Sequence, residues 1–385
     1  MPPRETEAFK HFRAGTHRTV SPEETLARVR PFLSQMGITR VANVTGLDRL
    51  GIPVAMAYRP NSRSLVVSPG KGLTLAAAKA SSAMEALEGW HAERPLVPLV
   101  LASWDELRAR RPVIDLAGLA RLSVREFDPR RPILWAEGND LLGGRAVWLP
   151  FELVHTNFTL PLPPNSGAFM PGSNGLASGN HRLEALAHGL CELIERDAVT
   201  LWHANDDAAC ARSRTDLGTV DDPACREVID RLHDAGVAVG AWEVTSDVGV
   251  AAWRCEIVDR HPEPSRPFFL GVGSGCHPSR GVALLRALTE AVQTRLTLIT
   301  GARDDIHVSH YAHSFDANAH ARALARIEDV TAAPRSFLDA PTWDADTLRE
   351  DVVGLLKRLA DVGVRQAVVV DLTRPEFDVP VVRVV

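Results

Sequence analysis

The sequence predicts an α+β fold built from repeated helix–strand–strand units. The same order of elements recurs three times along the 385 residues, over 24–59, 224–259 and 345–385. Three further stretches carry polar side chains at helical spacing among apolar ones, which predicts three helices that each have an acidic face. We therefore expect two-layer sandwiches of helices on sheets, with a binding site between the acidic helices.

Each repeated unit has the same local signals. A helix ends at a glycine, and two β-branched runs follow around a turn. A glycine just past a helix and a turn between β-branched runs are both typical of an antiparallel pair that packs on its helix. The glycines are Gly37, Gly236 and Gly363, and the turns lie at 45–48, 245–247 and 373–375.

A stretch rich in proline and glycine, beginning at Leu160, breaks the pattern. It divides the chain into an N-terminal part, 1–160, which holds the first acidic helix, and a C-terminal part, 161–385, which holds the other two. We expect both parts to belong to one continuous domain. The polar stretch 304–335 is predicted to be a mobile loop or a substrate cover.

Composition excludes several classes of protein. The net charge of −5 argues against nucleic acid or an anionic membrane as a partner. No apolar run approaches 18 residues, and the first residues are polar, unlike a signal peptide. A reduced, cytoplasmic protein without a zinc site is expected, because the cysteines are spread without C-x-x-C spacing. They are Cys191, Cys210, Cys225, Cys255 and Cys276.

The acidic faces point to metal-dependent chemistry. A carboxylate among Leu, Ala and Val costs free energy unless it is paired or bound to a cation. Six converging glutamates would repel one another, and Mg²⁺ ions carrying a polyphosphate would remove that repulsion. The three faces consist of Ser81, Glu85 and Glu88; of Glu184, His188, Glu192 and Glu195; and of Arg286, Glu290 and Gln293.

Two glycine-containing segments precede acidic helices. In 68–74, Lys71 could reach a phosphate and Thr74 is a candidate N-cap, but Gly72 after the lysine rules out a Walker A loop. The run 271–275 fits a dinucleotide fingerprint poorly, and we interpret it as a strand exit that places the third acidic helix.

Structural explanations compete with functional ones at several positions. A Glu-x-x-Glu pair alone is usually a solvated face. His188 is more often a packing histidine, and His277 before Pro278 a turn residue. Cys191 lies beside leucines, which favours a small core residue over a nucleophile.

Taken in order, these segments resemble the YcaO family of ATP-dependent peptide-modifying enzymes. One departure is Gly89, where the family usually has an arginine after the second glutamate of the first acidic helix. The matching motifs are Gly70-Lys-Gly-Leu-Thr, Ser81-x-x-x-Glu85-x-x-Glu88, Ser173 to Asn180 followed by x-x-x-Glu184, Glu192-x-x-Glu195-Arg196-Asp-Ala, and His277-Pro through Arg286-x-x-x-Glu290-x-x-Gln293-x-Arg295.

The resemblance implies ATP and Mg²⁺ as cofactors, bound between the acidic helices. It implies metal contacts for Glu85, Glu88, Glu184, Glu192, Glu195 and Glu290. It also implies nucleotide contacts for a second set of residues, to which Lys71 is added as a candidate: Arg18, Thr25, Ser81, Asn180, Arg196 and Arg286. Arg286, Glu290 and Gln293 are the expected catalytic residues.

The implied activity is phosphorylation of a backbone amide oxygen of a precursor peptide or protein. A side-chain nucleophile then gives an azoline, sulfide a thioamide and an amine an amidine. We expect a thioamide, made with a sulfide donor and a TfuA-type partner, because the run 293–305 resembles that branch and the chain begins almost directly in the YcaO region, without a leader-capture domain. The apolar final strand leads us to expect a further tail.

Three alternatives stay open. One is an azoline-forming cyclodehydratase. Another is an accessory factor for ribosomal protein methylthiolation, without peptide chemistry of its own. The third is an ADP-forming ligase of small acids. The sequence also leaves a homodimer open.

Overall fold

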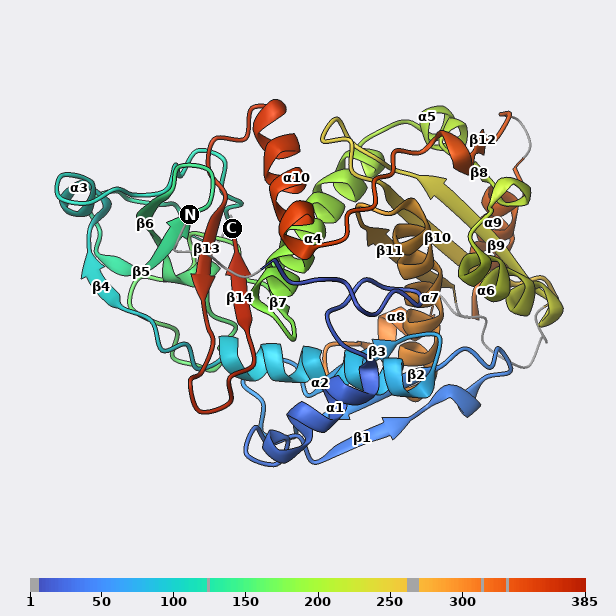
Figure 1. The fold of residues 1–385 in the computed structure, drawn as a ribbon, viewed down its shortest axis with the longest axis horizontal. Coiled ribbons are helices and arrows are strands. Elements are labelled where there is room, and N and C mark those ends of the chain that lie inside the picture. Colours follow the sequence, from blue (N-terminus) through green and yellow to red (C-terminus); the bar gives the residue numbers. More distant parts are fainter. Residues whose placement is uncertain (1–6, 123–124, 262–269, 313–314, 330–331) are drawn as a thin grey trace.

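The computed structural model of the protein describes residues 7–122, 125–261, 270–312, 315–329 and 332–385 (Figure 1). Three helix–strand–strand units are present where the sequence predicts them, so the α+β class and the repeat are confirmed. The glycine after each leading helix has a positive φ: 71° at Gly37, 70° at Gly236 and 91° at Gly363. Glycine adopts this conformation without steric cost, and it closely follows the leading helix of the second and third units, whereas Gly37 comes after a further helical turn beyond the first leading helix.

Each unit also gains a third strand and then an acidic helix. The first unit is α1 (Pro22–Val29), β1 (Arg40–Asn43), β2 (Val54–Tyr58), β3 (Val67–Lys71) and α2 (Leu75–Ala92). The second unit is α6 (Pro223–Asp234), β9 (Val237–Glu243), β10 (Ala252–Asp259), β11 (Gly271–Cys276) and α7 (Arg280–Thr300). Both sheets are antiparallel, with the middle strand paired on either side.

The third unit is assembled from two separate parts of the chain. Its leading elements are α10 (Leu348–Asp361), β13 (Val368–Asp371) and β14 (Val381–Val384). Its third strand, β7 (Leu176–Ser178), and its acidic helix, α4 (Arg182–His203), come much earlier. β14 joins the two parts because it pairs antiparallel with both β13 and β7.

The three units pack around a common centre. α2 packs against β7 of the third unit, α4 against β11 of the second, and α7 against β3 of the first. Each acidic helix therefore contacts the third strand of a neighbouring unit as well as its own. Figure 1 shows the three helices approaching one another near the middle of the molecule.

The run 271–275, predicted to be a strand exit, is instead the strand β11 itself. Its alternate glycines face α7: a Cβ added at Gly273 would lie 2.3 Å from the carbonyl oxygen of Ala287, and one at Gly275 would lie 2.2 Å from that of Ala283. The small residues therefore serve close helix–strand packing. Likewise, the first part of the predicted turn 68–74 belongs to β3, although Thr74 caps α2 as expected.

The stretch 304–335, predicted to be a loop, contains regular structure. It includes α8 (Val308–Ala312) and α9 (Ala317–Ile327), while 313–314 and 330–331 lie outside the described residues. Ala323 and Ile327 are buried against the second sheet, and the ring of His320 lies 2.7 Å from the carbonyl oxygen of Asp259. Tertiary packing thus supports a helix in a stretch where polar composition had indicated a loop.

The remaining elements extend the third sheet or cover the second. β4 (Leu99–Ala102), β5 (Ile133–Asp140) and β6 (Arg145–Pro150) continue the sheet beyond β13, and α3 (Trp104–Arg108) follows β4. α5 (Asp207–Arg212), β8 (Thr215–Asp216) and β12 (Arg335–Ser336) lie around the second unit. The proline-rich break is irregular chain before β7, as predicted. In the described part of the chain, every helix is too short or too polar to cross a membrane.

Candidate active site

Glutamates from all three acidic helices meet in one cleft. Glu85 and Glu88 come from α2, Glu192 and Glu195 from α4, and Glu290 from α7. Electrostatic coupling links them: Glu88 and Glu290 both act on Glu85, Glu192 acts on Glu88, and Glu195 acts on Glu192. Five of the six predicted metal ligands are thus neighbours in space, although the first and last of them, Glu85 and Glu290, are more than 200 residues apart in the sequence.

The third strand of each unit supplies one residue that donates hydrogen bonds to the acidic helix of a neighbouring unit. On β3, the Lys71 ammonium lies 2.5 Å from Glu290 of α7. On β7, the Ser178 hydroxyl donates to Glu88 of α2 at 2.7 Å, and its N–H donates to the same oxygen at 2.8 Å. On β11, the Ser274 hydroxyl donates to Glu195 of α4 at 2.7 Å. The packing of the units therefore fixes the positions of these carboxylates.

Three of these carboxylates are in surroundings that disfavour their charge. Burial, and then neighbouring glutamates, raise the pKa of Glu85 to about 8. Burial also raises the pKa of Glu88 and of Glu192 to about 7 in each case, although hydrogen bonds from Ser178 and the charge of Arg196 oppose the rise. Yet solvent reaches the Glu85 side chain. The Glu85 carboxylate is therefore open to solvent although many protein atoms lie around it.

Basic side chains lie in the same cleft. Burial would raise the pKa of Glu290, but Lys71 outweighs burial and the pKa is lowered. Arg196 is exposed and lies 3.8 Å from Glu192, so it pairs there rather than with its neighbour Asp197. On α7, Arg286 donates to the ring of His188 at 3.3 Å, and its buried Nε has no hydrogen-bond partner among the described residues. Cations and carboxylates are therefore interleaved.

The sixth predicted metal ligand, Glu184, has a different setting. It is buried at the start of α4 and accepts hydrogen bonds from the N–H and hydroxyl of Thr19, at 3.1 and 3.0 Å. Arg18 lies 3.5 Å from its other oxygen. The Asn180 side chain donates to the hydroxyl of Thr25 at 2.9 Å. The predicted nucleotide contacts Arg18, Thr25 and Asn180 thus form a polar group around Glu184, beside the cleft.

Two predicted residues lie at the edge of this arrangement. Ser81 is half-buried on α2, about one turn before Glu85. Gln293 is buried, and its amide nitrogen donates to the carbonyl oxygen of Pro69 at 2.7 Å. That bond ties α7 to β3 of the neighbouring unit. The catalytic role of Gln293 stays a prediction, as do the individual roles of the other residues.

The residues present fit Mg²⁺ with a polyphosphate. Carboxylates with raised pKa values are poised to bind a cation, and an arginine with an unpartnered N–H suits a phosphate oxygen. Among the described residues, no three of the glutamates bring oxygens within 4.8 Å of one another. Mg²⁺ sites of one or two carboxylates, completed by water and phosphate, need no closer shell. The cleft could therefore hold the metal and the nucleotide together.

Sequence reasoning missed Ser178, Ser274 and Thr19 as partners of the acidic residues. The first two were visible as single hydroxyls in small-residue runs just before an acidic helix. His277 lies in the turn between β11 and α7, as the sequence suggested, but sequence reasoning did not foresee that it lines a pocket beside the cleft. No local signal marks that pocket, because its walls come from four separate segments.

Comparisons with known proteins identify a family model and several relatives that match this chain. The family model for YcaO cyclodehydratase, ATP- and Mg²⁺-binding, matches residues 69–385. An uncharacterized protein in the tfuA 3' region of Rhizobium leguminosarum bv. trifolii is 38% identical over 372 residues, which is 96% of this chain and 87% of the relative.

Two solved structures share the fold. One, described as a heterocyclase in complex with substrate and cofactor, superposes with a TM-score of 0.83 at 23% identity, over 100% of this chain. This chain spans only 54% of that protein. The other is YcaO from Methanopyrus kandleri bound with AMPPCP and Mg²⁺, with a TM-score of 0.76 at 23% identity, over 98% of this chain and 93% of that one.

The prediction of ATP and Mg²⁺ as cofactors is confirmed by the family and by the nucleotide and metal bound in its solved member. The match covers most of the chain and includes all three acidic helices. The chain belongs to the YcaO family.

Proposed function

We propose that this protein activates a backbone amide of a ribosomally made precursor peptide or protein by O-phosphorylation and installs a thioamide. The observation that carries the ATP-dependent step is the cleft itself, where carboxylates from three helices are interleaved with cations from α4, α7 and the strand β3. Such a set can bind a metal through some side chains and phosphate through others. A transition state with charge spread over phosphate oxygens is stabilised by groups already held in place.

The roles follow from the contacts. Glu85, Glu88 and Glu192 would lose their protons and hold Mg²⁺. Lys71 would leave Glu290 for a phosphate oxygen, while Arg286 would use its free Nε–H on the transferred phosphoryl group. When hydrosulfide attacks the amide carbon, the carbonyl oxygen takes the γ-phosphoryl group from ATP and departs as phosphate, and the sulfur loses its proton as the C=S bond forms, so that the amide nitrogen keeps its N–H. No nucleophile from the protein is needed, because ATP supplies the leaving group.

The thioamide branch rests on two further observations. The relative in the tfuA 3' region is similar over nearly its whole length, which supports a TfuA-type partner for this chain. The run after α7 also reaches back to the cleft, because the charge of Arg303 acts on Glu85. The run 293–305 that resembles the TfuA-associated branch thus brings a positive charge, that of Arg303, close enough to act on Glu85.

Azoline formation is the second candidate, and the family's description as cyclodehydratase favours it. The two activities share the phosphorylation step and differ only in the nucleophile. Intact mass spectrometry of the precursor separates them: replacing oxygen by sulfur adds about 16 Da, whereas cyclodehydration removes about 18 Da.

The experiment combines the purified protein, its TfuA-type partner and the neighbouring precursor peptide with Mg²⁺, ATP and sulfide. We expect a gain of mass that requires both sulfide and ATP. Loss of water without sulfide would replace the thioamide by an azoline and leave the ATP site in place. Tight ATP binding with no change in any peptide would instead favour the accessory-factor alternative.

A further inference from the structure

A small pocket adjoins the cleft. It lies between the N-terminal segment, α4, the turn from β11 to α7, and α10, and has a volume of about 30 Å³. That is room for one or two molecules the size of water. The lining of the pocket includes Arg18, Glu184 and Arg286, which also belong to the polar groups already described. A molecule in the pocket would therefore lie beside the proposed phosphate contacts.

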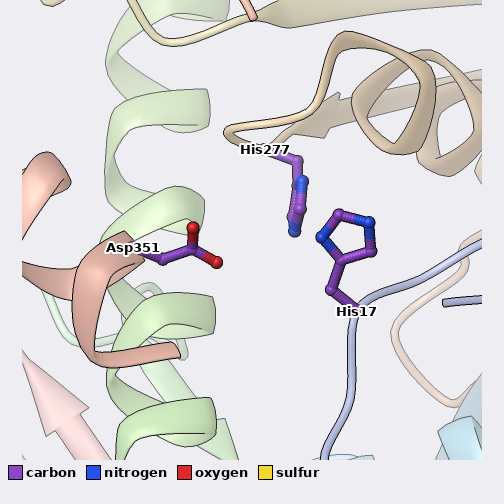
Figure 2. A group of neighbouring side chains, drawn as sticks. All are labelled: His17, His277 and Asp351. Carbon is purple, nitrogen blue, oxygen red and sulfur yellow. The ribbon is translucent and has the colours of Figure 1, made fainter. Parts of the chain in front are cut away.

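Two titratable groups in the pocket are buried and lack hydrogen-bond partners among the described residues. They are Nδ1 of His17, a residue 8% exposed, and Oδ1 of Asp351, which is 1% exposed. Figure 2 shows both side chains pointing toward the ring of His277. A buried polar atom without a hydrogen-bond partner destabilises the fold, so these two atoms beside the ring of His277 indicate a bound molecule.

The third side chain, His277, presents a donor. The N–H of Ser279 donates to its Nδ1 at 3.0 Å. In a neutral imidazole the other nitrogen then carries the proton, so Nε2–H faces the pocket. Burial lowers the pKa of His277, and nearby cationic side chains lower it further, which keeps the ring neutral. The pocket therefore offers N–H donors from His277 and Arg286, and acceptors from His17 and Asp351.

A metal ion is the obvious alternative, because ligand atoms of His17, His277 and Asp351 all lie within 4.8 Å of one another. Two histidines and a carboxylate are a common set for transition metals. Here, however, the protonated nitrogen of His277 cannot bind a metal. Asp351 is also already neutralised by Lys10, whose ammonium lies 2.7 Å away with both side chains buried.

The charge around the pocket favours an anion. Lys10 and Arg18 are paired with the acidic groups Asp351 and Glu184, whereas Arg286 forms no ion pair with the described residues and acts on His277 as an uncompensated positive charge. The rest of the lining is apolar or soft, including the thiols of Cys191 and Cys276 with Ala187, Pro278 and Leu348. A small, polarisable and weakly hydrated anion suits such walls better than a strongly hydrated one.

We propose that this pocket binds hydrosulfide, the anion of hydrogen sulfide, and holds it beside the phosphorylation site. The sulfur accepts a hydrogen bond from Nε2–H of His277 and lies beside the positive charge of Arg286, and its one S–H donates to Oδ1 of Asp351 or Nδ1 of His17. A diatomic anion fits the volume, and its single S–H satisfies one of the two unpartnered acceptors while its lone pairs accept from the ring of His277. The inference rests on the proposed thioamide function, for which it names the site of the second substrate.

The test measures hydrosulfide binding and turnover separately. Sodium hydrosulfide is titrated into chelator-treated protein carrying ¹⁵N-labelled histidine, and the ring nitrogens of His17 and His277 are followed by NMR. In parallel, the KM for hydrosulfide and the KM for ATP are measured in thioamide formation for the wild type, for His277→Gln and for His17→Asn. His203→Gln is the matched control, because His203 is exposed at the far end of α4.

In the wild type, hydrosulfide should shift the ring signals of both histidines. In each pocket variant the KM for hydrosulfide should rise at least tenfold, while the KM for ATP should change less than twofold. His203→Gln should change neither. Thioamide formation by the wild type, with no ring shift and an unchanged KM in the variants, would overturn the pocket and leave the function standing. Water loss without sulfide would overturn the function, and the NMR titration would still decide the pocket. The hydrosulfide site would also be overturned if Zn²⁺ bound tightly to these histidines and added hydrosulfide did not disturb that binding.

Discussion

The hydroxyl of Ser274 on β11 donates a 2.7 Å hydrogen bond to Glu195 on α4, and so joins two different units of the fold. The backbone N–H of the same serine donates to Glu290 on α7 at 3.2 Å. One small residue therefore sets the relative position of carboxylates from two acidic helices. Since Ser178 and Lys71 make the corresponding contacts from β7 and β3, the site depends on how the units pack as much as on the helices themselves.

Removing this hydroxyl should weaken nucleotide binding more than it weakens the fold. Ser274→Ala takes one donor from Glu195 and leaves that carboxylate less fixed; a hydrogen bond to a charged group is worth about 1.5–3 kcal/mol. We expect Mg·ATP affinity, measured by calorimetry, to fall about tenfold, or roughly 1.4 kcal/mol.

Ser213→Ala is the matched control. Its buried hydroxyl accepts from the Trp202 indole and donates to the carbonyl oxygen of Cys210, away from the glutamates. This variant should lower the melting temperature without changing ATP affinity. Equal losses of affinity in the two variants would mean that Ser274 acts only through stability.

Neutralising Glu290 tests the carboxylate cluster directly. Glu290→Gln removes the partner of Lys71 and one candidate Mg²⁺ ligand, while it also relieves repulsion among buried acids. The fold should therefore persist, and Mg·ATP affinity should fall at least tenfold, measured by calorimetry. Glu227→Gln, an exposed glutamate of α6 paired with Arg231, should leave affinity unchanged. Wild-type affinity in Glu290→Gln would exclude this residue from the nucleotide site.

The sequence was sufficient to predict the units, because their signals are local. A glycine past each helix and β-branched runs around a turn lie within about 40 residues of one another, and the structure has all three units in place. The acidic faces were equally visible, since three- and four-residue spacing depends only on the helix.

The assembly of the third unit could not be predicted in the same way. β7 pairs with β14, which comes about 200 residues later in the chain, and pairing over that distance leaves no periodic signal in either segment. The pocket is even harder to predict from the sequence, because His17, His277 and Asp351 meet only once four segments have packed. The helix α9 was missed for a related reason: its apolar face is short, and burial against the second sheet stabilises it.

The raised pKa values of the cleft predict an unusual pH dependence for the nucleotide-free protein. Glu85 has a pKa of about 8, and Glu88 and Glu192 of about 7, against an ordinary value of 4.5. Between about pH 5 and pH 8 the folded state thus binds more protons at these groups than the unfolded state does. Their contribution to the unfolding free energy is therefore lost as pH rises through this window.

Thermal unfolding without nucleotide should show a melting temperature that falls from pH 5.5 to pH 8.5. Glu85→Gln should flatten this slope, because glutamine keeps the shape without the ionisation, and Glu227→Gln should not. Mg·ATP should reverse the trend, since metal binding favours the deprotonated carboxylates and releases protons. A slope that is identical in the wild type and in Glu85→Gln would contradict the raised pKa.

Arg286 should be irreplaceable by lysine. Its Nη donates to His188, while its buried Nε–H is free for a phosphate or for the anion beside it. A lysine keeps the charge but cannot donate in two directions from a planar group. We expect Arg286→Lys to lower peptide-dependent phosphate release at least tenfold, about 1.4 kcal/mol in the activation free energy. Arg280→Lys on the same helix is the control, because that guanidinium donates to the carbonyl oxygen of Leu338 outside the cleft. Near-normal turnover in Arg286→Lys would make Arg286 a structural residue that only orients His188.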